Sequence, residues 1–339
     1  MLRPERGTAA RRTPLPRPGA LVRGGRWVGP PCPSGGPPGA ARRHHRQERP
    51  DMSLNATAVD LGTYGVWVTR TDLTADAAAE IERLGYGAVW VGGSPGADLE
   101  EVSTALAATS RIAVATGIVN IWTADAEALA DSFRRIESEH PGRFLLGIGA
   151  GHREANGPEA VRPFGAVVDY LDALDRGGVP ADRRVVAALG PRMLGLSAER
   201  SAGAHPYLVN PEFTRGAREA LGQGPLLAPE HKVALGEDRE RTRRTGRKGL
   251  SVYVDNRLTN YLANFRRLGF SDEDFADGGS DALVDAMVAQ GAPESAAAEL
   301  RAHLEAGADH VAVQPLAEDG DILPVLARLA PALGLTARG

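Results

Sequence analysis

The sequence predicts an α/β protein built as a (β/α)8 barrel, and three observations support this fold class. Short, nearly continuous apolar runs alternate with amphipathic helical windows from Val59 onward, which is typical of a parallel sheet covered by helices. About eight such βα units can be counted along the chain. Three helix-to-strand junctions carry a glycine, Gly85, Gly203 or Gly307, which supplies the left-handed conformation that ends a helix. A barrel is therefore favoured over an open doubly wound sheet, with active-site residues where strands end and loops begin.

Each expected element follows from its local pattern. Strands are assigned to apolar runs, and helices to windows whose apolar residues recur every three or four positions, as Ile81 and Leu84 do. The expected strands cover residues 59–68, 88–93, 111–120, 143–150, 183–190, 204–210, 231–238 and 308–316. The expected helices cover residues 76–87, 98–110, 124–140, 164–177, 192–203, 211–222, about 239–268 and 295–307. Residues 268–291 are extra, and we expect an insertion before the last helix that acts as a lid or a dimer contact.

Residues 1–51 differ in composition from the rest of the chain. They contain eleven Arg, no Lys, ten of the 24 prolines and only three acidic side chains. Too few large apolar side chains are present to offset the entropy of ordering this segment, so we expect a disordered Arg/Pro/Gly-rich extension. It is interpreted as an upstream extension or a misassigned start, with the working domain spanning residues 52–339. A nucleic-acid tail is the alternative, but interleaved aromatic residues are lacking.

Composition also excludes several classes of function. The whole chain carries a formal charge of −4 despite its basic first 51 residues, so the remaining domain is strongly acidic and no nucleic-acid partner is expected. The only cysteine, Cys32, lies in the extension, which excludes disulfides and cysteine-ligated zinc from the domain. No apolar run reaches the about 18 residues of a membrane span. We therefore expect a cytoplasmic protein with no membrane partner.

The segment LLGIGAGHRE, residues 145–154, is the first candidate for chemistry. Its strand ends in Gly147-x-Gly149, which resembles half of a dinucleotide fingerprint, but His152 holds the third glycine position and the unit is the fourth βα pair. A Rossmann domain is therefore not favoured. Small residues at a strand end let a planar ligand or a phosphate approach the backbone. His152 could act there as acid, base or hydrogen-bond donor; a solvated loop histidine is the alternative.

Two later segments are candidates for phosphate binding. Gly190-Pro191 lies between the fifth strand and a helix whose free N-terminus would bind anions, and Arg192 would add charge. An ordinary βα turn is the alternative for this segment. A mixed-charge helix follows further on, and we interpret it mainly as a solvated face. Its weaker phosphate candidates are Arg243, Arg244 and Lys248.

Other catalytic motifs are missing from the sequence. It contains no HExxH motif, no nucleophile elbow and no Walker lysine motif, and four histidines lack metal-ligand spacing, so no metal site is expected. These histidines are His205, His231, His303 and His310. Three tryptophans at or near strand ends could wall an aromatic cofactor or belong to the barrel core. They are Trp67, Trp90 and Trp122.

Five segments, taken in order, resemble the luciferase-like monooxygenase superfamily and, within it, the coenzyme F420-dependent oxidoreductases. They are LGYGAVWVGGSPG (84–96), IAVATGIVNIW (112–122), FLLGIGAGH (144–152), AALGPRMLGLSAERSAGAHPYLVNPEFT (187–214) and HLEAGADHVAVQ (303–314). The resemblance covers roughly residues 59–332. It implies a luciferase-like (β/α)8 barrel with an insertion, a homodimer, and a flavin or deazaflavin bound at the C-terminal mouth.

The resemblance also implies which residues meet the cofactor. Many deazaflavin members have a non-proline cis peptide bulge in the third strand, and the matching pair here is Gly117-Ile118; a glycine partner carries the smallest steric penalty. A strand that needs a small residue for packing is the alternative for Gly117. His152 would be the catalytic proton donor or acceptor. The implied cofactor contacts are Thr116, Gly117, Ile118, Val119, Asn120, Gly149, Ala150, Gly151, Gly190, Pro191 and Met193.

The chain also departs from these relatives. Gly92-Gly93 stands where several of them have an Asp-His pair, and the basic residues with which sugar-phosphate-oxidising relatives grip their substrate have no clear counterparts. The expected function is an F420-dependent oxidoreductase that transfers a hydride between the deazaflavin and a small-molecule organic substrate. An FMN-dependent luciferase-like monooxygenase and a non-catalytic cofactor-binding barrel are the alternatives.

Overall fold

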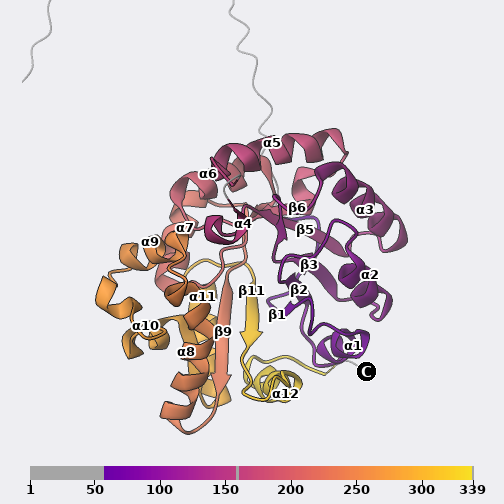
Figure 1. Ribbon diagram of the computed structural model, residues 1–339. Coiled ribbons are helices and arrows are strands. Elements are labelled where there is room, and N and C mark those ends of the chain that lie inside the picture. Colours follow the sequence, from indigo (N-terminus) through magenta and orange to yellow (C-terminus); the bar gives the residue numbers. More distant parts are fainter. Residues whose placement is uncertain (1–56, 158–159, 338–339) are drawn as a thin grey trace, which may run out of the picture. The chain divides into compact units, whose positions relative to one another are not determined.

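A curved, all-parallel sheet forms the centre of the computed structural model, which describes residues 57–157 and 160–337 (Figure 1). The strands in chain order are β1 (Tyr64–Thr69), β2 (Ala88–Gly92), β3 (Ala113–Thr116), β4 (Val119–Asn120), β5 (Phe144–Gly149), β6 (Arg184–Val186), β7 (Gly203–Ala204), β8 (Leu226–Leu227), β9 (Glu230–Leu235), β10 (Val288–Gly291) and β11 (Val311–Pro315). The expectations for the extension over residues 1–51 and for a domain start at residue 52 lie outside the described residues.

The sheet closes on itself through residues 226–235. The first part of this segment, β8, pairs with β7, and the second part, β9, pairs with β11. Hydrogen bonds continue on both sides between the two parts, because Ala228 N donates to Ala204 O at 3.0 Å and Ala312 N donates to Pro229 O at 2.9 Å. β1 pairs with both β11 and β2, and β10 adds to β9. The predicted (β/α)8 architecture is confirmed.

Eight helices follow the barrel strands and cover the outside of the sheet (Figure 1). They are α1 (Ala75–Arg83), α2 (Glu100–Ala107), α3 (Ala126–Glu139), α5 (Pro163–Arg176), α6 (Pro191–Arg200), α7 (Pro211–Leu221), α11 (Pro293–Glu305) and α12 (Leu323–Ala332). Thr74, Asp125 and Asn210 cap α1, α3 and α7 with side-chain oxygens that accept backbone N–H groups. The sequence interpretation missed α12, whose two prolines, Pro324 and Pro331, obscure an otherwise helical window. No helix among the described residues is long and apolar enough to span a membrane.

The insertion begins earlier in the chain than predicted. Its elements are α8 (Arg239–Asp255), α9 (Thr259–Arg267), the short 3-10 helix η2 (Asp272–Phe275) and α10 (Asp281–Met287), followed by β10. The helical region predicted over about 239–268 is present as α8 and α9, with a break between them where Arg257 has a positive φ of 49°. The insertion packs around a hydrophobic cluster that includes Leu250, Tyr261 and Phe265 and also takes in Leu208 and Ala234 of the barrel. Two further short elements are α4 (Arg153–Asn156) and the 3-10 helix η1 (Ala181–Arg183).

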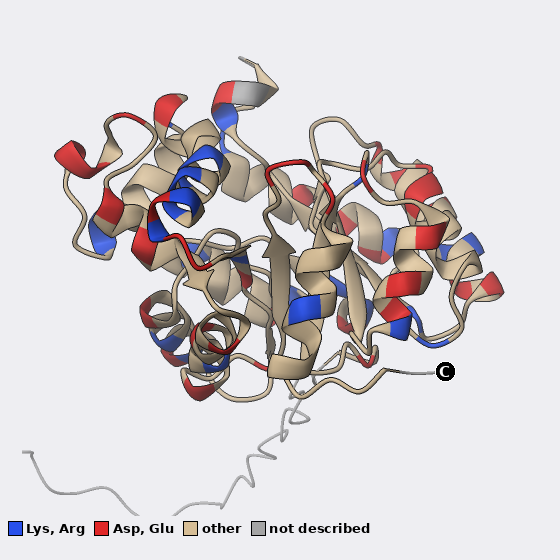
Figure 2. Cartoon of the chain, turned by 90° about the horizontal axis from the view of Figure 1, so that it is seen from below, with Lys and Arg blue, Asp and Glu red and all other residues tan. Residues whose placement is uncertain are grey.

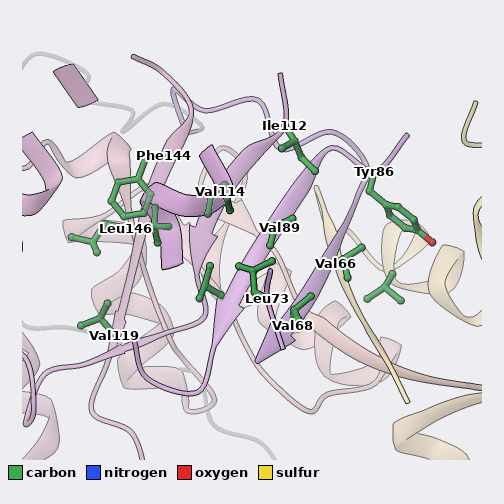
Figure 3. Close-up of a cluster of buried hydrophobic side chains, with 14 of the residues drawn as sticks. Val66, Val68, Leu73, Tyr86, Val89, Ile112, Val114, Val119, Phe144 and Leu146 are labelled. Carbon is green, nitrogen blue, oxygen red and sulfur yellow. The ribbon is translucent and has the colours of Figure 1, made fainter. Parts of the chain in front are cut away.

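Apolar side chains lie on both sides of the barrel wall. The outward layer, which includes Val66, Val89 and Phe144, packs against the helices (Figure 3). The inward layer contains Trp67 and Trp90 together with several alanines. Small inward residues leave room for the two indole rings, so the barrel interior is a packed core and ligand chemistry is confined to its ends.

Candidate active site

The Gly117-Ile118 peptide bond is cis, as predicted, and lies between β3 and β4. Both residues are partly exposed at the C-terminal end of the sheet. The Trp67 indole donates from Nε1 to Gly117 O at 3.0 Å. A Cβ on Gly117 would lie 2.8 Å from Trp67 Nε1 and 2.9 Å from His205 Nε2. The glycine therefore makes room for two neighbouring rings, which supports the packing explanation for its small size.

The polar residues of this rim hold strands and loop together. Thr116 Oγ1 donates to Gly147 O at 2.8 Å and accepts from Gly147 N at 2.8 Å. Asn120 Nδ2 donates to Asn156 Oδ1 at 2.7 Å, and Asn156 Nδ2 donates to Ala150 O at 2.9 Å. The predicted contacts Thr116, Asn120 and Ala150 are thus brought together, and their side chains or carbonyls are already engaged within the protein.

Small residues at the end of β5 are required by the packing around them. A Cβ on Gly149 would lie 2.9 Å from the Cβ of Ala187 and 3.1 Å from the side chain of Ile118. Gly151 has a φ of +55°, in the left-handed region that favours glycine. Val119 is fully buried in the outward core. Of these predicted contacts, Gly149 and Gly151 lie on the rim, whereas the Val119 side chain faces away from it.

His152 lies at the start of α4, on the loop that follows β5. Its ring is half-buried, and Nδ1 is buried with no hydrogen-bond partner among the described residues. The ring centroid lies 5.3 Å from that of Tyr261 and 6.2 Å from that of Tyr253. Burial lowers the pKa of His152, and this effect is opposed by Glu154 and by Asn260. The imidazole is therefore neutral at pH 7 and can accept a proton.

Gly190, Pro191 and Met193 lie at the start of α6, beside the end of β6. Gly190 precedes the helix and Pro191 occupies its first turn, and a Cβ on Gly190 would meet nothing within 4 Å. Met193 packs against the hydrophobic cores. The Arg192 guanidinium lies 4.3 Å from the centre of the Phe164 ring. The helix start is thus open on the Gly190 side, while Arg192 is engaged by an aromatic neighbour.

A buried polar cluster on β9 was not predicted from the sequence. Lys232 and Glu230 are 1 % and 0 % exposed and form an ion pair at 3.1 Å. Lys232 Nζ also donates to Tyr207 OH at 2.8 Å and to Gln314 Oε1 at 2.7 Å. Burial lowers the pKa of Lys232 and raises that of Glu230, and each partner opposes the shift of the other. The sequence contained one signal for this cluster, because the charged residues Glu230 and Lys232 occupy alternate, inward-facing positions of an apolar strand.

Aromatic side chains extend this cluster across the mouth toward His152. Tyr253 OH donates to Tyr207 OH at 2.8 Å. The Tyr207 ring lies 5.2 Å from Trp67, and Tyr261 lies 4.8 Å from Tyr253. Burial raises the pKa of Tyr207, Tyr253 and Tyr261, so all three phenols stay protonated. A chain of aromatic contacts therefore runs from β1 through β7 and the insertion to the β5 loop.

A cavity of about 410 Å³ opens beside this chain, at the carboxyl ends of β1 and β11 and against α8. Basic residues are concentrated in the first part of α8, and Figure 2 colours Lys and Arg blue. Arg243 pairs with Asp281 and Asp285, so this phosphate candidate is engaged, whereas Arg244 and Lys248 reach the cavity. The polar and aromatic side chains that line the cavity include Trp67, Thr69, Asp72, Arg244, Lys248, Gln314 and Glu318.

The two glycines at the end of β2, Gly92 and Gly93, have a structural explanation. A Cβ on Gly92 would lie 1.9 Å from Cζ2 of Trp67, so any larger residue at this position would displace the indole. Gly93 has a φ of +74°. The Trp67 ring thus occupies the space beside Gly92, at the position where several relatives have the Asp-His pair. This contact accounts for the departure noted in the sequence.

The other two tryptophans play different parts. Trp90 is fully buried, stacks on His205 with ring centroids 4.0 Å apart, and donates to His310 Nε2 at 3.0 Å. Trp122 Nε1 donates to Ala150 O at 2.9 Å. Trp90 therefore belongs to the barrel interior, Trp122 supports the β5 loop, and Trp67 is the tryptophan that lines the cavity.

The four histidines without metal-ligand spacing are all buried. Burial lowers the pKa of His205, His231 and His310 to about 4, and burial with the neighbouring His231 places the pKa of His303 well below its ordinary value. They are neutral hydrogen-bonding groups of the core. Among the described residues no group of three or more His, Cys, Asp or Glu could hold a metal ion.

Comparison with known proteins agrees with this architecture. Residues 52–177 match the family described as luciferase-like monooxygenase, so the predicted resemblance is confirmed. No curated protein matches the chain.

Among solved structures, an F420-dependent secondary alcohol dehydrogenase with a bound F420-acetone adduct is 14 % identical, covers 80 % of this chain and 98 % of its own, and has a TM-score of 0.62. The coenzyme F420-dependent tetrahydromethanopterin reductase from Methanopyrus kandleri is 15 % identical. The match covers 80 % of this chain and 99 % of the reductase, with a TM-score of 0.59. The FMN-bound oxygenating constituent of 3,6-diketocamphane monooxygenase from Pseudomonas putida is 15 % identical. The match covers 82 % of this chain and 98 % of the monooxygenase chain, with a TM-score of 0.56. At these low sequence identities, the similarity to the three structures shows a shared fold and nothing further.

Proposed function

We propose, from a luciferase-like barrel whose residues 52–177 match that family, that this chain is an oxidoreductase that transfers a hydride between coenzyme F420 and a small organic substrate. The observation that carries the proposal is His152, a half-buried neutral imidazole with an unpartnered, buried Nδ1 at the carboxyl ends of the strands. A proton acceptor in that place is what alcohol or hydride chemistry requires.

The residues at the mouth fit a flat ring cofactor. The Gly117-Ile118 peptide is partly exposed there, and the aromatic contacts from Trp67 to Tyr261 form a wall of fixed rings. The open side of Gly190 and the free N-terminus of α6 would receive a phosphate of the cofactor tail. We assign cofactor binding to the rim residues 116–120 and 149–151 and to Gly190, Pro191 and Met193.

When bound, F420 would supply the hydride chemistry, and the protein would supply orientation and proton transfer. The His152 imidazole would take or return the proton that accompanies the hydride. Gly149 and Gly151 would let the ring approach the backbone of the β5 loop. The wall of tyrosines would exclude water from one side of the mouth.

An FMN-dependent monooxygenase is the second candidate, because one of the similar structures is an FMN-bound monooxygenase with a TM-score of 0.56. F420-dependent enzymes and monooxygenases both occur among the similar structures, so the choice of the deazaflavin rests on the sequence resemblance, in which the Gly117-Ile118 pair matches the cis peptide of deazaflavin members. A non-catalytic barrel remains the third alternative. The homodimer implied by the resemblance and the cytoplasmic location stay predictions.

A paired titration separates the two cofactors. The purified full-length chain is titrated with F420 and, separately, with FMN, while the quenching of cofactor fluorescence is followed. We expect saturable binding of F420 and no saturable binding of FMN at the same concentrations. Tight binding of FMN together with no response to F420 would make the monooxygenase the better assignment.

A further inference from the structure

The cavity beside Trp67 is built from the inward faces of two neighbouring strands. β1 pairs with β11 so that Val66 lies opposite Val313, and both of these side chains belong to the outward core. Trp67 and Gln314, the next residue on each strand, therefore point to the inside of the barrel, and both line the cavity of about 410 Å³. The cavity thus lies at the catalytic end of the barrel rather than on its outer surface.

Gln314 is held by its carbonyl oxygen. Lys232 Nζ donates to Gln314 Oε1 at 2.7 Å, and Tyr207 OH donates to the same oxygen at 2.7 Å. An ammonium group has donors and no acceptor, so the amide atom next to it must be oxygen. Tyr207 is fixed in turn, since its hydroxyl accepts from Lys232 and from Tyr253. The buried ion pair of Lys232 with Glu230 anchors the whole arrangement.

The fixed oxygen determines what Gln314 offers to the cavity. With Oε1 occupied by two donors, the Nε2 amide group is the end of the side chain that remains to meet a ligand, and it can donate two N–H groups. A ligand oxygen that only accepts hydrogen bonds would pair with it. A ligand hydroxyl could also accept a hydrogen bond from Gln314 Nε2, but it carries no negative charge that would strengthen the interaction.

Charge adds a second preference. Arg244 and Lys248 line the cavity, are exposed, and form no ion pair within the described part of the chain. Of the two acidic residues of the lining, Glu318 is paired with Arg241 at 2.8 Å, whereas Asp72 accepts from the neutral Thr69 Oγ1 at 2.6 Å and keeps its charge. Among the described residues, the two unpaired cations therefore outnumber the one unpaired carboxylate, and the net charge offered to a ligand is positive.

We propose that this cavity binds the carboxylate group of a small organic substrate, with Gln314 Nε2, Arg244 and Lys248 as its donors and with Trp67 and Leu316 against the apolar body. Gln314 determines specificity, and Lys232 and Tyr207 position it. The description of the ligand as a substrate rests on the proposed oxidoreductase function. The binding preference itself does not require the cofactor, so the two proposals can fail separately.

Calorimetric titration of the full-length, cofactor-free chain tests the preference with two matched probes, benzoate and benzyl alcohol. We expect benzoate to bind at least tenfold more tightly. Gln314→Glu keeps an oxygen for Lys232 but replaces the donor by a carboxylate oxygen, and it should weaken benzoate binding by tenfold or more with little effect on benzyl alcohol. Gln223→Glu, which adds the same charge at an exposed position, should leave both affinities unchanged.

Two exposed positions keep the test decisive if Gln314→Glu does not fold. Arg244→Gln and Lys248→Gln should each weaken benzoate binding about threefold to tenfold, whereas Arg215→Gln on the exposed face of α7 should not. Equal affinity for the two probes, or unchanged benzoate affinity in Arg244→Gln and Lys248→Gln, would overturn the proposal. Benzoate binding that depends on these residues in a chain that ignores F420 would overturn the cofactor assignment and leave this inference standing.

Discussion

At the scale of single residues, His152 combines three properties that suit proton transfer. Its Nδ1 is buried without a partner among the described residues, its ring faces Tyr261, and burial lowers its pKa. The sequence predicted its place on the rim from the GIGAGH segment. The tyrosines around it come from α8 and α9, about 100 residues later in the chain, so their contact with His152 depends on how the insertion packs and could not be predicted from local pattern.

Replacement of His152 tests its catalytic role. We expect His152→Ala to lower kcat by about 10²- to 10⁴-fold with an accepted substrate, the usual contribution of a general acid or base, and to leave F420 binding nearly intact. In the direction that needs a base, wild-type kcat/KM should fall only at a pH below the ordinary titration range of histidine, because burial lowers the pKa of His152.

His140→Ala, at the end of α3, is the matched control and should retain wild-type kinetics. An unmutated rate in His152→Ala would remove the catalytic assignment while leaving the fold untouched.

Gly92 and Gly117 show how far residue-level prediction reached. The sequence raised the question of why Gly117 interrupts a buried strand, and it predicted the cis bond from the resemblance. It did not predict that Trp67 and His205 fill the space beside Gly117, or that Trp67 also occupies the space where a side chain at position 92 would lie. Both facts depend on the rotamer of one indole between three strands, which no local pattern specifies.

At the scale of elements, strand order and helix positions followed the sequence pattern, and the errors have identifiable causes. β6 and β7 are shorter than expected: Ala187 N and His205 N still donate to the neighbouring strands at 2.9 Å and 3.0 Å, but the chain then leaves the ladder toward the mouth. The break after α8 occurs without proline or glycine, at Asn256–Leu258. Residues 288–291, at the end of the segment predicted as an insertion, form β10, which pairs with β9.

The polar pair on β9 should show the energetics of a buried ion pair. Lys232→Met leaves the Glu230 carboxylate buried without its cation, although Leu208 N still donates to it at 2.7 Å. We expect a loss of about 3–5 kcal/mol in the free energy of unfolding, as is typical when one partner of a buried pair is removed. Urea unfolding measures this loss.

The double variant Lys232→Met with Glu230→Gln should recover a large part of that stability, because the remaining group is neutral. Equal losses in the single and the double variant would contradict the view that an unpaired charge causes the damage.

At the scale of the whole molecule, the buried histidines link stability to pH. The pKa values of His205, His231 and His310 are lowered to about 4, whereas in the unfolded chain a histidine titrates near 6.5. Between these values the unfolded state binds more protons, so the free energy of unfolding decreases as the pH falls from about 6.5 to about 4. Each of the three groups contributes on the order of 3 kcal/mol. Glu230 and Glu299, whose pKa values are raised by burial, that of Glu299 to about 7, oppose this trend.

Urea unfolding at pH 7.5, 6 and 5 tests this linkage. The midpoint should be highest at pH 7.5 and should decrease at each step toward pH 5. His140→Ala, which removes a histidine outside the buried set, should leave the slope unchanged. A midpoint that is constant or rises toward pH 5 would show that the buried histidines do not control acid stability.

The central claim is that F420 binds at the C-terminal mouth, between the β3–β5 rim and the start of α6. The fluorescence titration with F420 becomes a test of location when it is repeated on Gly190→Leu, because a side chain at Gly190 enters open space and its backbone suits any residue. Gly216→Leu, on α7 with equally open space, is the matched control. We expect saturable F420 binding to the wild type and to Gly216→Leu, and binding at least tenfold weaker to Gly190→Leu. No F420 binding to the wild type, or equal binding to all three chains, would contradict this claim.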